Sequence, residues 1–135
     1  MVRLNVLVAI NFFLSIVVCE LIIRVCKVLN NLKGISLDTA KTYGVKIIYN
    51  TDGTIAQHLY PFYINNELSA IKTRYVKDKR FTFEGTIQNT GLFGQNLFKS
   101  GGKYLTITEG ECDAMAAYEL LGSKWAVVSI KRGAA

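Results

Sequence analysis

Three carboxylates lie close together in the segment Glu109-Gly-Glu-Cys-Asp113. Gly110 between them permits a sharp turn and lets a phosphate group approach the backbone. Carboxylate oxygens suit Mg²⁺, which usually takes one or two carboxylates together with water and phosphate oxygens. The segment is therefore a candidate Mg²⁺ site. The other interpretation is that these acids only complement the positive N-terminus of a helix, and the pattern leaves both open.

A strongly basic stretch spans residues 72–80, with five basic residues against one acid. Cations interleaved with aromatic rings favour the binding of phosphates and stacked bases. In a strand, Lys72 and Arg74 share one face, so the cations are partly aligned. The alternative is a solvated edge strand that its charge protects from aggregation. The residues concerned are the basic Lys72, Arg74, Lys77, Lys79 and Arg80 and the aromatic Tyr75, Phe81 and Phe83.

Other kinds of site have little support in the sequence. His58 is the single histidine and lies within an expected strand, where a packing role is favoured over metal binding. The three cysteines are widely spaced and form no CxxC pair, which argues against zinc and against a disulfide framework. A reduced, intracellular setting is the default expectation for such a chain. The segment 101–103, Gly-Gly-Lys, lacks the spaced first glycine and the following Ser or Thr of a phosphate loop, so we interpret it as a turn.

The carboxylates are placed by a strand, a helix and a second strand. Residues 104–108 form a β-type run, residues 111–121 carry apolar side chains at helical spacing, and residues 125–130 form another β-branched run. Strand, helix and strand in so short a segment predict a βαβ unit with two parallel strands. Ligands gather at the carboxyl ends of such strands. Glu109-Gly110 lies at that end of the first strand.

Upstream of this unit, the sequence predicts a short helix followed by strands. Ser36 suits the N-cap of the helix, and Gly44 can end it. Asp52-Gly53 and Asn65-Asn66 supply tight turns, whereas Pro61 suits an edge strand or a bulge. The fold class expected for the whole chain is therefore α/β. The expected strands are residues 45–49, 54–64 and 68–76, and residues 85–102 are expected to be a loop.

Length and composition limit the function classes. The chain of 135 residues has the size of one domain, or of a small domain with an appendage. Half of its residues are hydrophobic and 19% are charged, which excludes a disordered or collagen-like chain. A net charge of +6 favours an anionic partner such as nucleic acid, nucleotide or acidic lipid. Residues 4–23 are nearly all apolar and long enough to span a bilayer, but they also suit a buried helix, a buried strand pair or a segment foreign to this domain.

Taken in order, these features resemble the primase half of bacteriophage-type primase-helicases, a group that includes the mitochondrial helicase Twinkle. The resemblance covers about residues 30–135, and its last part is similar to the start of a Toprim fold, the metal-binding module of primases and topoisomerases. The matching segments are Lys33-Gly-Ile-Ser36, Tyr43-Gly44, Lys72-Thr-Arg74, Asp78-Lys79-Arg80-Phe81, Leu92-Phe93-Gly94, Leu97-Phe98, Gly101-Gly102-Lys103, Thr108-Glu-Gly-Glu-Cys-Asp113, Val127-Val128-Ser129-Ile130 and Gly133-Ala134.

The resemblance implies RNA primer synthesis on single-stranded DNA from ribonucleotides during phage DNA replication, in the cytoplasm of the host. Glu109 would be the catalytic Toprim glutamate and would hold Mg²⁺ together with Asp113. Lys72 and Lys79 would act in catalysis by contacting nucleotide phosphates or template, and Arg74 would share that work. The implied division is an apolar segment at residues 1–29, an α+β basic subdomain at 30–100, and an incomplete Toprim domain at 101–135.

Three features depart from the pattern of this family. The Asp-x-Asp motif that should follow on the next strand is absent, as are an upstream zinc domain and a Walker A motif. We therefore expect a fragment that binds Mg²⁺ weakly and primes poorly or not at all by itself. The alternative function is a non-catalytic nucleic-acid-binding module, with or without a membrane tether through residues 4–23.

Overall fold

The computed structural model of the chain describes residues 34–132. The apolar segment 4–23 lies outside the described residues, as do Lys33 and Gly133-Ala134 of the family resemblance. The interpretations of residues 1–29 therefore stay predictions. Within the described range, no helix has both the length and the apolar character needed to cross a membrane.

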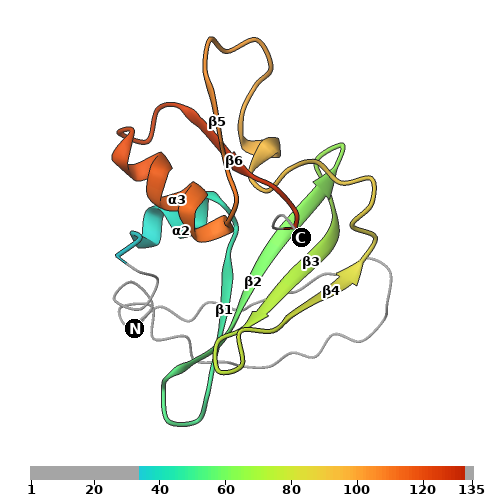
Figure 1. The fold of residues 1–135 in the computed structure, drawn as a ribbon, viewed down its shortest axis with the longest axis vertical. Helices are drawn as coiled ribbons and strands as arrows, with labels where there is room; N and C mark the ends of the chain where they lie inside the picture. Colours follow the sequence, from blue (N-terminus) through green and yellow to red (C-terminus); the bar gives the residue numbers. More distant parts are fainter. Residues whose placement is uncertain (1–33, 133–135) are drawn as a thin grey trace.

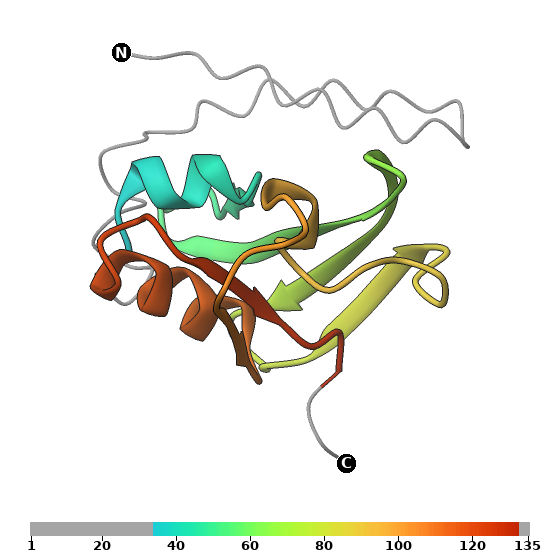
Figure 2. The ribbon, with the colours of Figure 1, turned by 90° about the horizontal axis from the view of Figure 1, so that it is seen from above.

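Two small sheets organise the described residues (Figure 1). The larger sheet is antiparallel with the order β1-β2-β3-β4, and the smaller sheet pairs β5 with β6 in parallel. Helices α2 and α3 lie side by side next to the sheets, as the view from above also shows (Figure 2). This mixture confirms the predicted α/β class. The elements are α2 (Leu37–Thr42), β1 (Lys46–Tyr49), β2 (Ile55–Ile64), β3 (Glu67–Tyr75), β4 (Phe81–Gly85), the 3₁₀ helix η1 (Gln95–Leu97), β5 (Leu105–Thr108), α3 (Glu111–Leu120) and β6 (Ala126–Ser129).

The caps and turns of the first half follow from local side-chain chemistry. Ser36 caps α2, because its hydroxyl accepts a hydrogen bond from the Thr39 N–H at 3.2 Å. Asn65 and Asn66 have φ values of 50° and 67°, the left-handed pair that a tight two-residue hairpin turn requires. Pro61 lies in β2 beyond the residues that pair with β1, and next to a register shift after Phe62. Its missing N–H therefore interrupts no ladder on that side.

Strand β4 was not predicted from the sequence. It pairs with β3 over Phe81–Gly85, which makes β3 an interior strand of the sheet. The interpretation of the basic stretch as a solvated edge strand is therefore wrong. Lys72 on β3 is only 6% exposed. A buried ammonium is tolerated only where partners compensate its lost hydration, and the candidate site supplies them.

The predicted βαβ unit is confirmed. Strands β5 and β6 are parallel, with Leu105 opposite Ala126, and α3 forms the connection between them. Ala114 and Met115 are completely buried, but Leu121 at the end of the expected apolar stripe is 42% exposed. The buried face of α3 is thus shifted toward its N-terminal turn, where Glu111 and Cys112 contact side chains of the antiparallel sheet.

An aromatic cluster around Tyr43 joins the two sheets. The Tyr43 ring stacks on Phe93 at 5.3 Å between centroids, and its hydroxyl donates to the Val127 carbonyl on β6 at 2.8 Å. Phe93 also exchanges backbone hydrogen bonds with Ser129, so the segment before η1 lies along the outer edge of β6. Gly94 has φ of 80°, and a Cβ there would come within 2.5 Å of the Tyr43 ring. This packing holds β6 in place against the antiparallel sheet.

Candidate functional site

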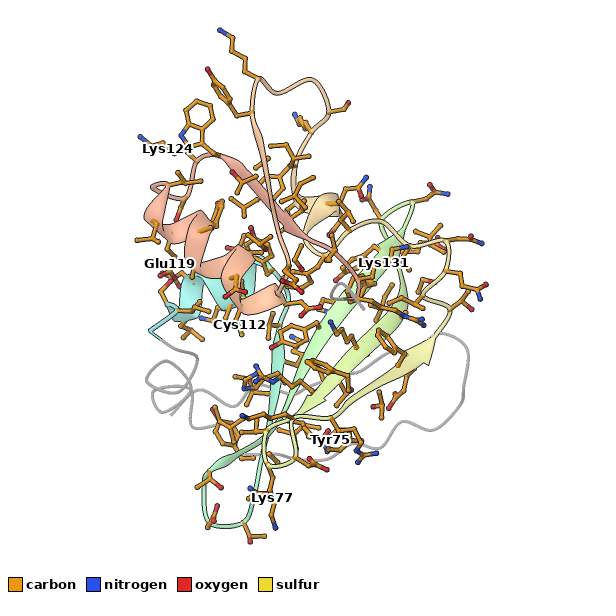
Figure 3. The ribbon with its side chains drawn as sticks, viewed as in Figure 1. Tyr75, Lys77, Cys112, Glu119, Lys124 and Lys131 are labelled. Atoms are coloured by element: carbon orange, nitrogen blue, oxygen red, sulfur yellow. The ribbon has the colours of Figure 1, made fainter. Side chains whose placement is uncertain are left out.

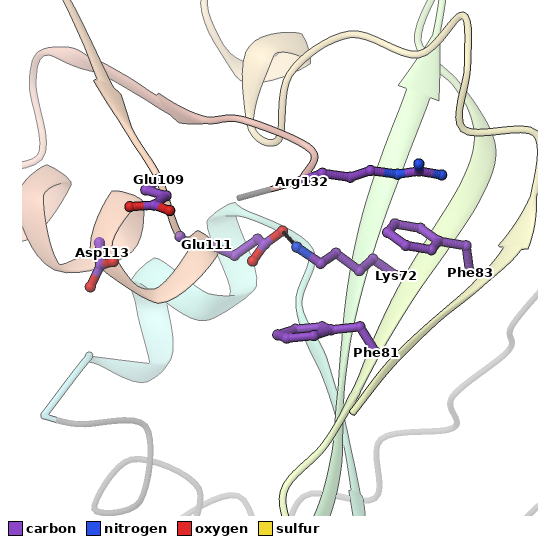
Figure 4. A pocket seen from close by; sticks show the side chains of 8 residues that line it. Lys72, Phe81, Phe83, Glu109, Glu111, Asp113 and Arg132 are labelled. Carbon is purple, nitrogen blue, oxygen red and sulfur yellow. Dashed lines mark hydrogen bonds and ion pairs between the residues drawn. The ribbon is translucent and has the colours of Figure 1, made fainter. Parts of the chain in front are cut away.

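An open pocket of about 430 Å³ lies where the end of β5 faces β3 and β4. One wall comes from the junction of β5 and α3 and is acidic, and the opposite wall comes from the antiparallel sheet and is basic and aromatic (Figure 4). The carboxyl end of β5 is where a ligand was expected. The lining residues are Lys72, Phe81, Phe83, Glu109, Gly110, Glu111, Asp113 and Arg132.

Glu109 and Asp113 flank the turn at the start of α3, and both side chains belong to exposed residues. Gly110 is the N-cap of the helix, and an Asp113 carboxylate oxygen lies 2.8 Å from the position that a Cβ on Gly110 would take. Because Gly110 has no side chain, the Asp113 carboxylate can lie this close to the helix N-cap. Both residues line the pocket.

Glu111, the middle acid of the segment, has a different environment. Its carboxylate accepts a hydrogen bond from the Lys72 ammonium at 2.6 Å, and the two side chains are 6% and 7% exposed. Lys72 also donates to the Lys131 carbonyl at 3.1 Å. This buried ion pair connects the antiparallel sheet to the βαβ unit across the pocket (Figure 4). The sequence predicts no separate role for Glu111, because adjacency to Glu109 does not reveal which acid turns inward.

The basic wall is built on aromatic rings. The Lys72 ammonium lies 4.6 Å and the Arg74 guanidinium 5.9 Å from the centre of the Phe81 ring, which confirms that the two cations share one face of β3. Arg132, which follows β6, lies over Phe83 at 5.3 Å. Arg132 was not among the predicted site residues. Its distance in sequence from the basic stretch concealed it, although its place after a parallel strand is a signal that it could reach the pocket.

The other predicted basic residues lie away from the pocket. Lys77 and Lys79 belong to the turn that joins β3 to β4, and Arg80 lies at its end. Arg80 stacks over the Tyr75 ring at 4.3 Å and pairs with Asp78 at 3.6 Å in an exposed position. The structure thus separates Lys72 and Arg74 from Lys77, Lys79 and Arg80, which sequence proximity had grouped together.

A buried polar chain lies beneath the pocket. The His58 ring nitrogen Nδ1 is 3.0 Å from the Tyr60 hydroxyl, which in turn is 3.4 Å from the Cys112 thiol. Burial, assisted by the nearby Arg74 charge, lowers the pKa of His58 to about 4. Burial also raises the pKa of the Tyr60 hydroxyl, and Cys112 adds to this effect. His58 is therefore neutral at pH 7 and fills a packing position, as expected.

The donor set of the acidic wall suits a hard cation. Within residues 34–132, no group of three or more His, Cys, Asp and Glu side chains is arranged to hold a metal ion. The two carboxylates beside Gly110 nevertheless fit the preference of Mg²⁺ for one or two carboxylates, completed by water and phosphate oxygens. Glu111 does not add to this set, since Lys72 holds its carboxylate.

The fold pairs an antiparallel sheet with a βαβ unit, and the pocket between them places carboxylates opposite cations that lie over aromatic rings. No protein-family model matches the chain. The DNA helicase/primase of Enterobacteria phage T3 is 45% identical to it over 58 residues, which are 43% of this chain and 10% of the T3 protein.

Two solved structures resemble the fold. The primase fragment of the bacteriophage T7 primase-helicase matches with a TM-score of 0.64 and 35% identity, covering 74% of this chain and 40% of that one. A structure of T7 lagging-strand DNA polymerase interacting with primase domains bound to an RNA/DNA hybrid and dTTP contains a chain that matches with a TM-score of 0.65 and 34% identity. That match covers 76% of this chain and 45% of the T7 chain.

The chain is thus related to the primase part of phage primase-helicases, which confirms the resemblance seen in the sequence. It spans less than half the length of each of these relatives. The activity, substrates and partners of a whole primase-helicase are therefore matters for proposal.

Proposed function

We propose that this chain is part of a DNA primase-helicase that synthesises RNA primers on single-stranded DNA during phage DNA replication. The observation that carries the proposal is the pocket between the two sheets. It brings the exposed carboxylates of Glu109 and Asp113 opposite cations that lie on the Phe81 and Phe83 rings. A polyphosphate needs such a pairing of cation-binding oxygens with positive charge.

In this proposal Glu109 and Asp113 hold Mg²⁺, and Glu109 is the catalytic glutamate. A bound Mg²⁺ supplies charge neutralisation at a transferred phosphate. The chain's own residues supply positioning: Gly110 leaves room for a phosphate near the backbone, and Arg132 offers a guanidinium for phosphate oxygens. Further carboxylates, such as those of an Asp-x-Asp motif, would have to come from outside this sequence.

The basic residues take two roles. Lys72 acts in the pocket, with Arg74 beside it on the Phe81 ring. The turn residues Lys77, Lys79 and Arg80 contact the phosphates of the template or of a nucleotide from outside the pocket, and Lys79 acts in catalysis only if that turn closes over the ligand. Single-stranded DNA and ribonucleotides are the proposed partners, and the T7 structure with an RNA/DNA hybrid and dTTP supports this choice.

The proposed division of the chain follows the same scheme. Residues 30–100 form the basic subdomain of the primase, and residues 101–135 are an incomplete Toprim domain. The parallel pair β5 and β6 with α3 between them supports the second assignment, because a Toprim module begins with such a unit. The working compartment in this proposal is the cytoplasm of the phage-infected cell.

Binding of a fluorescent ribonucleoside triphosphate, with and without Mg²⁺, tests the proposal on the chain itself. We expect Mg²⁺ to increase the affinity, and Glu109→Gln to remove most of that increase. Asp113→Asn should do the same. Glu67→Gln is the matched control, since Glu67 is an exposed acid at the start of β3 outside the pocket. Equal affinity with and without Mg²⁺, or an effect of Glu67→Gln as large as that of Glu109→Gln, contradicts the proposal.

The second candidate is a non-catalytic module that binds nucleic acid. The ion pair between Lys72 and Glu111 favours it, because a lysine already neutralised by a buried carboxylate contributes less to a nucleotide. Binding by such a module falls with salt and ignores both Mg²⁺ and Glu109. The nucleotide titration therefore separates the two candidates.

A further inference from the structure

Two parallel strands begin with the same short pattern of a small residue, a lysine and an aromatic residue. The segment 102–104, Gly-Lys-Tyr, leads into β5, and the segment 123–125, Ser-Lys-Trp, leads into β6. Because Leu105 pairs with Ala126, the two patterns are aligned residue by residue. Tyr104 is the counterpart of Trp125, and Lys103 is the counterpart of Lys124.

The two aromatic rings form an exposed pair. The centroids of Tyr104 and Trp125 are 5.7 Å apart at an interplanar angle of 80°. The two residues are 69% and 47% exposed, whereas the aromatic residues Tyr43, Tyr60 and Phe93 are buried. An exposed apolar patch of this kind marks a binding surface.

The charge around the ring pair is entirely positive along both segments. Residues 99–108 and 120–132 contain no Asp or Glu, and Lys99, Lys103 and Lys124 lie close to the rings in sequence. A second copy of the chain would bring these lysines against one another, which opposes self-association. A partner with flat apolar faces and regularly spaced anions suits the surface, and single-stranded nucleic acid has both.

This surface is separate from the pocket. The aromatic residues lie at the amino ends of β5 and β6, whereas Glu109 and Arg132 lie beyond their carboxyl ends. Figure 3 shows Lys124 before β6 well away from Lys131 after it. None of the residues at the amino ends lines the pocket.

We propose that Tyr104, Trp125, Lys103 and Lys124 form a basic-aromatic platform that binds single-stranded nucleic acid outside the pocket. A base stacks on the exposed aromatic faces, and the lysines neutralise the adjoining phosphates. The platform needs neither Mg²⁺ nor the carboxylates of the pocket, so it stands independently of the proposed catalytic function. In a replication protein it would hold a strand at a distance from the site of synthesis.

Trp125 is the only tryptophan of the chain, so its fluorescence reports on the platform directly. The experiment is a titration of the full chain with a short oligodeoxythymidylate without Mg²⁺, monitored by tryptophan emission. We expect saturable quenching that weakens as salt is raised. Tyr104→Ala should weaken the affinity about tenfold, which is the scale of one lost stacking contact. The double variant Lys103→Glu/Lys124→Glu should weaken it further.

The matched control is Lys41→Glu/Lys46→Glu, which makes the same charge change on α2 and β1. It should leave the quenching curve nearly unchanged. A second measurement follows a labelled oligonucleotide by anisotropy, where Trp125→Ala should lose affinity and Trp125→Phe should retain most of it. The proposal is overturned if the emission does not change on saturation, or if the control weakens binding as much as the platform variant. Quenching that depends on protein concentration without oligonucleotide, which indicates self-association, overturns it as well.

Discussion

The two ends of the basic stretch occupy contrasting environments. Lys72 on β3 is buried, lies over the Phe81 ring and is neutralised by Glu111. Lys77 and Lys79, a few residues later, lie exposed on the turn before β4. One run of positive charge in the sequence therefore serves two physical purposes. The first lysine joins two sheets at the site, and the later ones leave their charge available to an anion in solution.

The difference shows that the role of a lysine depends more on its contacts in the fold than on its neighbours in the sequence. A buried ammonium requires a carboxylate and further acceptors close by, so the position becomes part of the structure. An exposed ammonium keeps its hydration and acts through its long-range charge. Substitutions at the two ends should therefore affect different measurements.

The largest effect is expected at the buried end. Lys72→Met leaves the Glu111 carboxylate buried without its partner, which should lower the free energy of unfolding by about 3–5 kcal/mol. Lys79→Met, which removes the same charge from the turn, should change it by less than about 0.5 kcal/mol. Urea unfolding of both variants measures the contrast.

The double variant Lys72→Met/Glu111→Leu provides the control. Replacing both partners by apolar side chains should recover most of the stability lost in Lys72→Met, because no charge then remains buried. A double variant as unstable as the single one contradicts the assignment of this pair as the source of the effect.

The second largest effect is expected from acid, which should lower the free energy of unfolding through the buried His58. The pKa of His58 is lowered to about 4 in the fold, chiefly by burial and also by Arg74, from an ordinary value of 6.5. The unfolded chain therefore binds the proton more readily, and stability falls as the pH drops from about 6.5 to about 4, by up to about 3 kcal/mol. Arg74→Met should reduce this loss only slightly, since burial is the larger cause. Unfolding curves across this pH range test the sign and size of the effect.

Charge reversal at the exposed end of the basic stretch should change the affinity for nucleic acid and leave the stability of the fold nearly unchanged. Lys77→Glu and Lys79→Glu together should lower the affinity for a short single-stranded oligonucleotide. Each lost phosphate contact reduces the salt slope by about 0.7. Thermal unfolding should remain close to that of the unmodified chain. Affinity and slope unchanged in this variant would show that the turn does not contact nucleic acid.

The smallest effect is expected for Arg80, which lies at the border of the two regions. Its contact with the Tyr75 ring and its exposed pair with Asp78 are both surface interactions. Arg80→Ala should therefore lower the free energy of unfolding by no more than about 1 kcal/mol. A loss as large as that of Lys72→Met would place Arg80 with the buried end instead.

Local patterns predicted most of the fold. The hydroxyl of Ser36, the paired asparagines at 65 and 66 and the strand-helix-strand spacing after Tyr104 each act within a few residues, so the sequence reveals them directly. Strand β4 was missed because its residues continue a basic stretch, and its pairing with β3 depends on a partner in the sheet. Such non-local pairing has no short-range signature.

The candidate site was predictable in its acidic half. Glu109 and Asp113 follow a strand end, and the carboxyl-end rule placed them in a crevice. Glu111 and Arg132 were missed, because their partners Lys72 and Phe83 are distant in sequence and meet them only after folding. The separation of Lys72 from Lys79 was missed for the same reason. Tertiary contacts, which no spacing rule records, decide which member of a charged segment faces the pocket.

The buried thiol of Cys112 can report how often α3 separates from the antiparallel sheet. It lies on the first turn of α3, is 8% exposed and touches the Tyr60 hydroxyl of β2. An alkylating reagent can reach this sulfur only while the helix is separated from the sheet. Peptide mass spectrometry of the alkylated chain would therefore time how often the acidic wall leaves the basic one.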